Sequence, residues 1–136
     1  MCEQPQHLRR ETHAAGVIER HDNQILIATF EGPETLSRLW QFPRGRVNRG
    51  ESPETAVRRI AKRKLGITVE VVLGQPPLVA ELDGKPVELR YFFCGLMLGE
   101  ARSGPYAEIQ WIPRAHLREY DFDPASQMVA DWMVHS

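Results

Sequence analysis

The sequence predicts an α/β fold in which a β-sheet is sandwiched between helices. Three observations support this prediction. Short apolar runs separated by turn residues recur along the chain and are typical of strands. A helix with clear start and stop signals lies near the middle, and helical segments close the chain. Strands combined with helices in this way pack as layers around a common core.

The first part of the chain is expected to form two strands and a short third one. Residues 14–20 and 25–30 are apolar segments separated by the polar turn "HDNQ". Residues 31–38 are rich in polar residues and contain Gly and Pro, which predicts a loop. The short apolar strand "LWQFP" ends at Pro43, and a Gly-containing loop is predicted over 44–52.

The central helix has recognisable ends. Ser52 is a good N-cap, Pro53 suits the first helical position, and Glu54 is favoured in the first turn. The helix is expected to run to about Lys64, and Gly66 closes it.

The second half alternates strand and helix signals. The predicted elements are a strand at 67–74, two strands over 77–98 around an Asp83-Gly84 turn, a strand at 108–113, and helices at 113–120 and 124–135. Four large side chains near the end are predicted to be core residues: Trp111, Met128, Trp132 and Met133. No internal repeat or linker interrupts the chain, so one domain is expected over 1–136.

Composition narrows the class of protein. The chain of 136 residues is 42% hydrophobic and 26% charged, which is typical of a soluble globular domain. The longest apolar run, residues 91–98, is too short to span a bilayer, and the amino terminus lacks the apolar region of a signal peptide. Cys2 and Cys94 form neither a disulfide framework nor a zinc pattern, so a reduced, cytoplasmic setting is expected.

Charge is distributed unevenly. Residues 44–64 contain eight basic and two acidic residues, a net charge of +6, although the whole chain carries −1. A local cluster of one sign is a candidate binding surface for phosphate or nucleic acid. It lacks the interleaved aromatic residues with which single-strand binders stack on bases, so nucleic acid is the less favoured partner.

The segment "WQFPRGRVNRGESPETAVRRIAKRKLGI" resembles the Nudix box, the signature of pyrophosphohydrolases that act on nucleoside-diphosphate-linked compounds. Gly45 matches its first Gly, Glu51 follows after five residues, and Arg59 after seven more. Gly66 and Ile67 close the motif at the expected spacing. The resemblance implies the Nudix fold, a mixed β-sheet between helices in an α/β/α arrangement.

The resemblance covers nearly the whole chain and is strongest to the MutT-like branch, which clears oxidised nucleoside triphosphates. The segment "EIQWIPRAHLREYDFDPASQMVADWM" is similar to the end of that branch, where a base pocket is expected. Phe122 and Ser126 match positions in that pocket. Relatives often have Asn at the position of Ser126, and a single hydroxyl reads fewer base edges.

The box departs from the family pattern at its catalytic centre. The three positions where the family has Glu are Ile60, Arg63 and Lys64 in this chain. Magnesium prefers carboxylate oxygens, and an ammonium about 4 Å from a divalent ion would be repelled by roughly 8 kcal/mol at an effective dielectric of about 20. No metal is therefore expected at the usual site.

Two readings of the function remain open. In the first, the protein binds a nucleotide or other diphosphate-containing ligand without a cofactor and has lost or greatly weakened hydrolysis. Its ligand- or phosphate-binding candidates are Arg44, Gly45, Arg46, Arg59, Arg63, Lys64, Phe122 and Ser126. A homodimer is one assembly that the resemblance suggests.

In the second reading, a displaced carboxylate site supports Mg- or Mn-dependent hydrolysis. Glu51 and Glu108 are then the catalytic candidates, and Glu51, Glu54 and Glu108, or another acid such as Glu81, would hold the metal. Two of these acids also have a simpler interpretation. Glu51 can brace the loop through a salt bridge to Arg59, and Glu54 is an acid favoured by the helix dipole.

Overall fold

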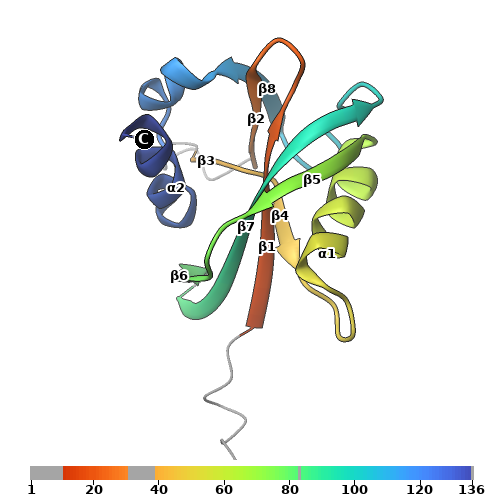
Figure 1. Cartoon of the computed structure of the whole chain (residues 1–136). Coiled ribbons are helices and arrows are strands. Elements are labelled where there is room, and N and C mark those ends of the chain that lie inside the picture. The colour runs from red at the N-terminus through yellow and green to blue at the C-terminus, as the bar shows by residue number, and fades with distance from the viewer. Residues whose placement is uncertain (1–10, 31–38, 83, 136) are drawn as a thin grey trace, which may run out of the picture.

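In the computed structural model, which describes residues 11–30, 39–82 and 84–135, the strands form one eight-stranded sheet (Figure 1). The strands are β1 (Glu11–Glu19), β2 (Gln24–Thr29), β3 (Trp40–Gln41), β4 (Arg44–Arg46), β5 (Thr68–Gly74), β6 (Leu78–Leu82), β7 (Lys85–Leu98) and β8 (Glu108–Pro113). The main order is β3-β2-β1-β7-β5, with β4 beside β1, β6 beside β7 and β8 beside β2. Strands β1 and β7 are parallel and the other pairs antiparallel, which confirms the predicted mixed sheet.

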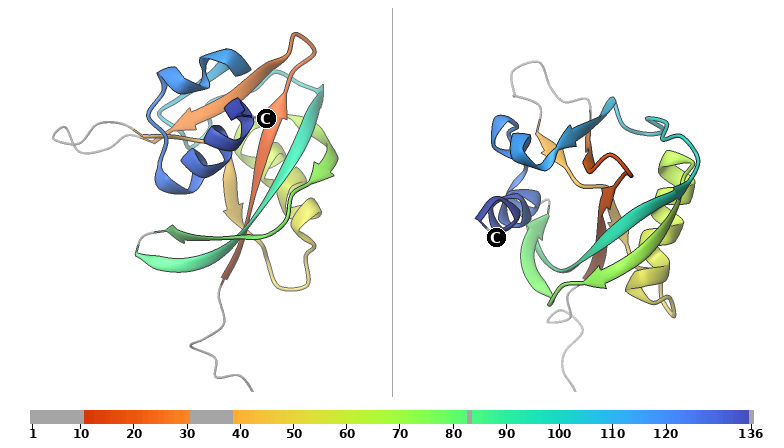
Figure 2. Two further views of the ribbon diagram at one scale, coloured as in Figure 1. Left: turned by 60° about the vertical axis from the view of Figure 1, so that its left-hand side comes forward. Right: turned by 45° about the horizontal axis from the view of Figure 1, so that its top comes forward.

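Helices cover both faces of this sheet (Figures 1 and 2). Helix α1 (Pro53–Ile60) continues into the π-helical turn η2 (Ala61–Leu65) and packs on one side. The 3-10 helix η3 (Arg114–Glu119) leads into α2 (Pro124–His135) on the other side. The arrangement is the α/β/α sandwich that the sequence predicts.

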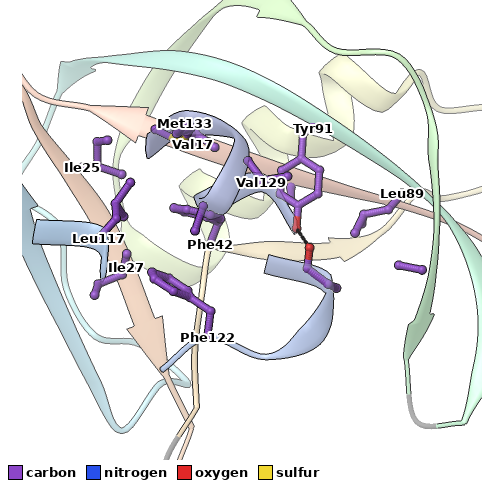
Figure 3. Packing of buried hydrophobic residues seen from close by; sticks show 14 of the residues in the cluster. Val17, Ile25, Ile27, Phe42, Leu89, Tyr91, Leu117, Phe122, Val129 and Met133 are labelled. Carbon is purple, nitrogen blue, oxygen red and sulfur yellow. Dashed lines mark hydrogen bonds between the residues drawn. The ribbon is translucent and has the colours of Figure 1, made fainter. Parts of the chain in front are cut away.

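Two apolar clusters fill the spaces between the layers. Under α1, Val57 and Ile60 pack with residues of β1, β2, β5 and β7. Under α2, Phe42, Tyr91 and Phe122 form an aromatic group, in which the Tyr91 hydroxyl donates to the Ala125 carbonyl at 2.9 Å (Figure 3). Because both faces of the central strands are buried, these strands are continuously apolar rather than alternating.

The predicted ends of α1 are confirmed. The Ser52 hydroxyl accepts from the Thr55 amide at 3.1 Å, and Pro53 begins the helix. Gly66 ends it in the left-handed conformation, with φ of 73°. The last turn, 61–65, is π-helical rather than α-helical, since the Gly66 amide also reaches back to the Ala61 carbonyl.

Two predictions about local structure are wrong. Residues 44–46, expected in a loop, form β4, because their backbone pairs with His13–Ala15 of β1. Met128 and Trp132, expected in the core, are 46% and 50% exposed, whereas Met133 is buried as expected. Trp111, the fourth of these residues, is partly buried and packs against the cluster under α1.

The hairpin formed by β6 and β7 is confirmed, with Leu82 paired to Lys85. Its predicted turn residue Asp83, and the loop predicted over 31–38, lie outside the described residues. None of the helices in the described ranges is long and apolar enough to cross a membrane.

Candidate functional site

A cleft of about 600 Å³ opens between the Nudix-like segment and the start of α2. One side of the cleft is formed by β4, which contributes Arg44 and Gly45, and by η2, which contributes Lys64. Residues 123–125 and the tip of the β6–β7 hairpin line it from the opposite side. The cleft therefore brings together three of the predicted ligand-binding residues.

Ile60 occupies a closed space between α1 and β4. Its side chain is 3% exposed and belongs to the core under α1. A Cβ atom added to Gly45 would lie 2.9 Å from the Ile60 Cδ1 atom. The close approach of β4 to α1 thus favours glycine at position 45, because a methyl group there would force the end of the Ile60 side chain to shift. Ile60 itself has no polar atom to offer a ligand.

Lys64 points its amine toward β4. Its Nζ atom donates to the Arg44 carbonyl at 2.9 Å and lies 5.9 Å from the centroid of the Tyr106 ring. Burial, and then the positive charges of Arg44 and Arg59, lower the pKa of Lys64 from its ordinary value. A half-buried cation therefore stands where the family pattern has an acid.

Arg44 forms an ion pair across the cleft wall. Its Nη2 atom lies 2.7 Å from Asp123 Oδ2, and the two side chains are only 15% and 16% exposed. The Asp123 Oδ1 atom accepts from the Ser126 amide at 2.9 Å and so caps α2. The Arg44 Nη1 atom is buried and has no hydrogen-bond partner among the described residues.

Glu51 is held away from the cleft by Arg59. Arg59 donates from Nε and Nη2 to the two Glu51 carboxylate oxygens at 2.8 and 3.0 Å, and the Asn48 amide donates to the same carboxylate. These contacts lower the pKa of Glu51 to about 2. Arg59 also donates to the Arg46 carbonyl at 2.8 Å, so the pair braces the loop before α1.

The remaining charged candidates are scattered. Arg46, Glu54 and Arg63 are exposed and do not line the cleft. Glu108, at the start of β8, accepts from Gln110 Nε2 at 2.6 Å. Glu81 is exposed at the hairpin and does line the cleft.

The residues at the three altered positions do not fit a divalent metal ion. One is a buried aliphatic side chain, one is an exposed guanidinium and one is an ammonium bonded to a backbone carbonyl. Across residues 11–30, 39–82 and 84–135, no three His, Cys, Asp or Glu side chains are grouped to hold a metal.

The predicted base-pocket residues lie in the core rather than on the cleft wall. Phe122 is 6% exposed and stacks on Phe42 at a centroid distance of 5.3 Å. Ser126 is fully buried and accepts from the Phe42 amide at 3.2 Å. Their neighbour Asp123 faces the cleft instead, as does Gln41, and neither was singled out from the sequence.

The sequence did contain one signal for Asp123. It directly precedes a proline that starts a helix, which is a favoured N-cap position for an acid. A carboxylate placed there is fixed in direction by the helix. It can therefore form an ion pair with a neighbouring cation, as Asp123 does with Arg44.

This fold, with its cleft beside the altered box, defines a Nudix-type domain. The chain belongs to the NUDIX domain family, whose sequence model matches residues 14–131. This result and the relatives below confirm the predicted Nudix superfamily and its MutT-like branch.

Curated relatives belong to the same family, and a solved structure shares the fold. The 8-oxo-dGTP diphosphatase of Escherichia coli (strain K12) is 27% identical over 116 residues, covering 85% of this chain and 90% of that protein. The CTP pyrophosphohydrolase of the same organism is 26% identical over 111 residues, 82% of each chain. A MutT protein from Methanosarcina mazei Go1 superposes with a TM-score of 0.76 at 20% identity, over 93% of this chain and 91% of that one.

Proposed function

We propose that this NUDIX domain binds a nucleotide or another diphosphate-containing small molecule in the cleft, and that its metal-dependent hydrolysis is lost or greatly weakened. One observation carries the proposal. The Lys64 amine, bonded to the Arg44 carbonyl at 2.9 Å, stands at the cleft where the family pattern has a carboxylate. A fixed cation there attracts phosphate oxygens and repels a divalent ion.

The loss of chemistry follows from the same residues. Ile60 can neither ligate a metal nor take a proton from water, because its side chain is aliphatic and enclosed. Glu51, the acid that matches the box, is fully engaged by Arg59 and the Asn48 amide. A carboxylate with a pKa of about 2 is also a weak general base at neutral pH.

Mg- or Mn-dependent hydrolysis is the second candidate function, and the relatives favour it. Two of these relatives are an 8-oxo-dGTP diphosphatase and a CTP pyrophosphohydrolase. In this chain the reaction would need a displaced site built from Glu51, Glu54, Glu108 or Glu81. Variant Nudix boxes on one fold can differ in chemistry, so the two candidates require a direct test.

The test is calorimetric titration with a nucleoside triphosphate and with ADP-ribose, in EDTA and in Mg²⁺ or Mn²⁺, together with a phosphate-release assay. The proposal expects binding in EDTA and no metal-dependent turnover. Turnover that needs metal and falls in E51Q or E108Q would establish the hydrolase instead. Absence of nucleotide binding under both conditions would reject the binding role.

Two related expectations stay predictions. The cysteine content favours a reduced, cytoplasmic setting. A homodimer is suggested only by resemblance to the family. Gel filtration with light scattering would measure the assembly directly.

A further inference from the structure

Within the described ranges, some of the basic residues in 44–64 form ion pairs with acidic side chains, and others do not. Arg59 is paired with Glu51, and Arg44 with Asp123. Arg46 and Arg63 are exposed, where water and salt screen their charge. Lys64 is half-buried, and among the described residues no carboxylate lies within ion-pair distance of it.

Lys64 is also short of hydrogen-bond acceptors. An ammonium has three N–H donors, and the contact to the Arg44 carbonyl uses one of them. Its charged neighbours, Arg44 and Arg59, are both cations. A half-buried cation beside other cations is unfavourable until an anion joins it.

Arg44 supplies a second unmet donor at the same place. Its Nη1 atom is buried without a partner in the described part of the chain, while Nη2 is held by Asp123. Both Arg44 and Lys64 line the cleft, and the Lys64 amine is bonded to the Arg44 backbone. Two cationic side chains that have unused N–H donors therefore lie together at one cleft.

We infer that Lys64 and Arg44 together form a subsite for a phosphoryl dianion, such as the terminal group of a diphosphate, and that Lys64 is its charge-determining residue. This rests on the proposed function, which it makes more specific. Lys64 contributes a point charge, and Arg44 contributes a directed N–H donor. Asp123 competes with the anion for the Arg44 guanidinium, so it limits the affinity.

Of the basic residues in the box, Lys64 and Arg44 have this role, and Arg63 and Arg46 do not. The latter two lie outside the cleft lining and are exposed. Arg63 is therefore a matched control, since it is a neighbour of Lys64 with the same charge on the same turn of helix.

The experiment is calorimetric titration of the full chain with inorganic pyrophosphate in EDTA at low ionic strength. K64M keeps the aliphatic stem and removes the charge, so its affinity should fall by about 10- to 100-fold. R63M should stay within about threefold of the wild type. D123N keeps a capping side chain but removes the competing charge, and should bind more tightly.

K64R separates charge from packing, because it keeps a cation at the site. Restored binding in K64R, with weak binding in a folded K64M, supports the subsite. Equal losses in K64M and R63M, or no gain in D123N, overturn it. If K64M does not fold, the D123N and K64R results decide the question alone.

Failure of this inference is distinguishable from failure of the proposed function. Nucleotide binding that K64M leaves unchanged would keep the function and reject the subsite. Pyrophosphate binding that depends on Lys64, without any nucleotide binding, would keep the subsite and reject the function. A wild-type protein that binds neither ligand rejects both.

Discussion

If the cleft binds phosphate as proposed, the charge of the side chain at position 64 determines which ligand it holds. The Lys64 ammonium is held by the Arg44 carbonyl and partly removed from water. A phosphate dianion binds the protonated amine, so affinity should fall as pH rises through the Lys64 pKa. Because that pKa is lowered, the fall begins at lower pH than for an exposed lysine.

Pyrophosphate affinity measured from about pH 8 to 10.5 tests this, with K64R as the control. Arginine side chains in general stay charged in this range, and burial raises the pKa of Tyr106 to about 12. The other charged residues of the cleft are present in both proteins, so their effects cancel in the ratio of the two affinities: Glu11, His13, Glu81, Lys85 and Asp123. A wild-type to K64R affinity ratio that stays constant with pH would contradict the prediction.

The second prediction concerns the stability of the folded protein in acid and rests on Glu51. The Arg59 hydrogen bonds lower its pKa from 4.5 to about 2, so its ionised form stabilises the folded state. A depressed carboxylate pKa gives stability that is complete above the unfolded pKa and is lost as pH falls through the folded one. The loss from this group should therefore fall between about pH 4.5 and 2.

Thermal unfolding of E51Q across this range measures the effect. The difference in stability between wild type and E51Q should be largest above pH 4.5 and should shrink toward pH 2. E54Q is the control, since Glu54 is exposed in the first turn of α1. A difference that does not change with pH would show that Glu51 acts through packing alone.

At the scale of elements, the contact between β4 and α1 carries the third prediction. A Cβ atom on residue 45 would lie 2.9 Å from Ile60 Cδ1 and 3.1 Å from Ile60 Cγ1. G45A should therefore destabilise the protein by about 1–3 kcal/mol, the usual range for overpacking a core. The measurement is urea unfolding monitored by circular dichroism.

I60V provides the matched test, because it removes the Cδ1 atom that the new methyl group would meet. In the double variant G45A/I60V, the loss should be smaller than the sum of the two single losses. Additive losses would mean that β4 and α1 move apart instead of sharing this contact.

Elements with local signals were predictable, and those defined by distant partners were not. Ser52, Pro53 and Gly66 set the ends of the α1–η2 helix through their own geometry, so the sequence predicted those ends. Residues 44–46 have no strand-like pattern of side chains. They form a strand because β1 offers unpaired backbone groups, which only the tertiary structure reveals.

The C-terminal helix shows the same limit. Met133 is buried, but Met128 and Trp132 on the same helix are about half exposed. Large apolar residues predict that α2 packs on the sheet, but their identity does not determine which side of the helix does so. That depends on tertiary contacts with the sheet, where Val129, Ala130 and Met133 of α2 are buried.

For the whole molecule, the cluster of positive charge was predictable but its use was not. Eight basic residues in the box suggested a broad phosphate-binding face. In the structure, ion pairs within the fold engage Arg44 and Arg59, while Arg63 is exposed. Of the basic residues in the cluster, Arg44 and Lys64 line the cleft, and Asp123, distant in sequence, pairs with Arg44.

The fourth prediction concerns restoration of the family pattern with the triple variant I60E/R63E/K64E. Without metal it should be less stable than the wild type, because Ile60 lies at 3% exposure and a carboxylate there is desolvated. It should also lose metal-free pyrophosphate binding, since the Lys64 cation is gone. Mg²⁺ that binds only the folded form should stabilise it by about 2.7 kcal/mol at 100 times its dissociation constant.

Thermal unfolding with and without Mg²⁺ distinguishes wild type from variant. If these three side chains alone determine whether the site binds a metal ion, Mg²⁺ should raise the Tm of the triple variant by several degrees. It should leave the Tm of the wild type unchanged. R63E is the control, because its acid is exposed and adds a single carboxylate. A wild-type protein that Mg²⁺ stabilises as strongly as the variant must bind the metal through other acids, and hydrolysis at a displaced site would then be the better account of this cleft.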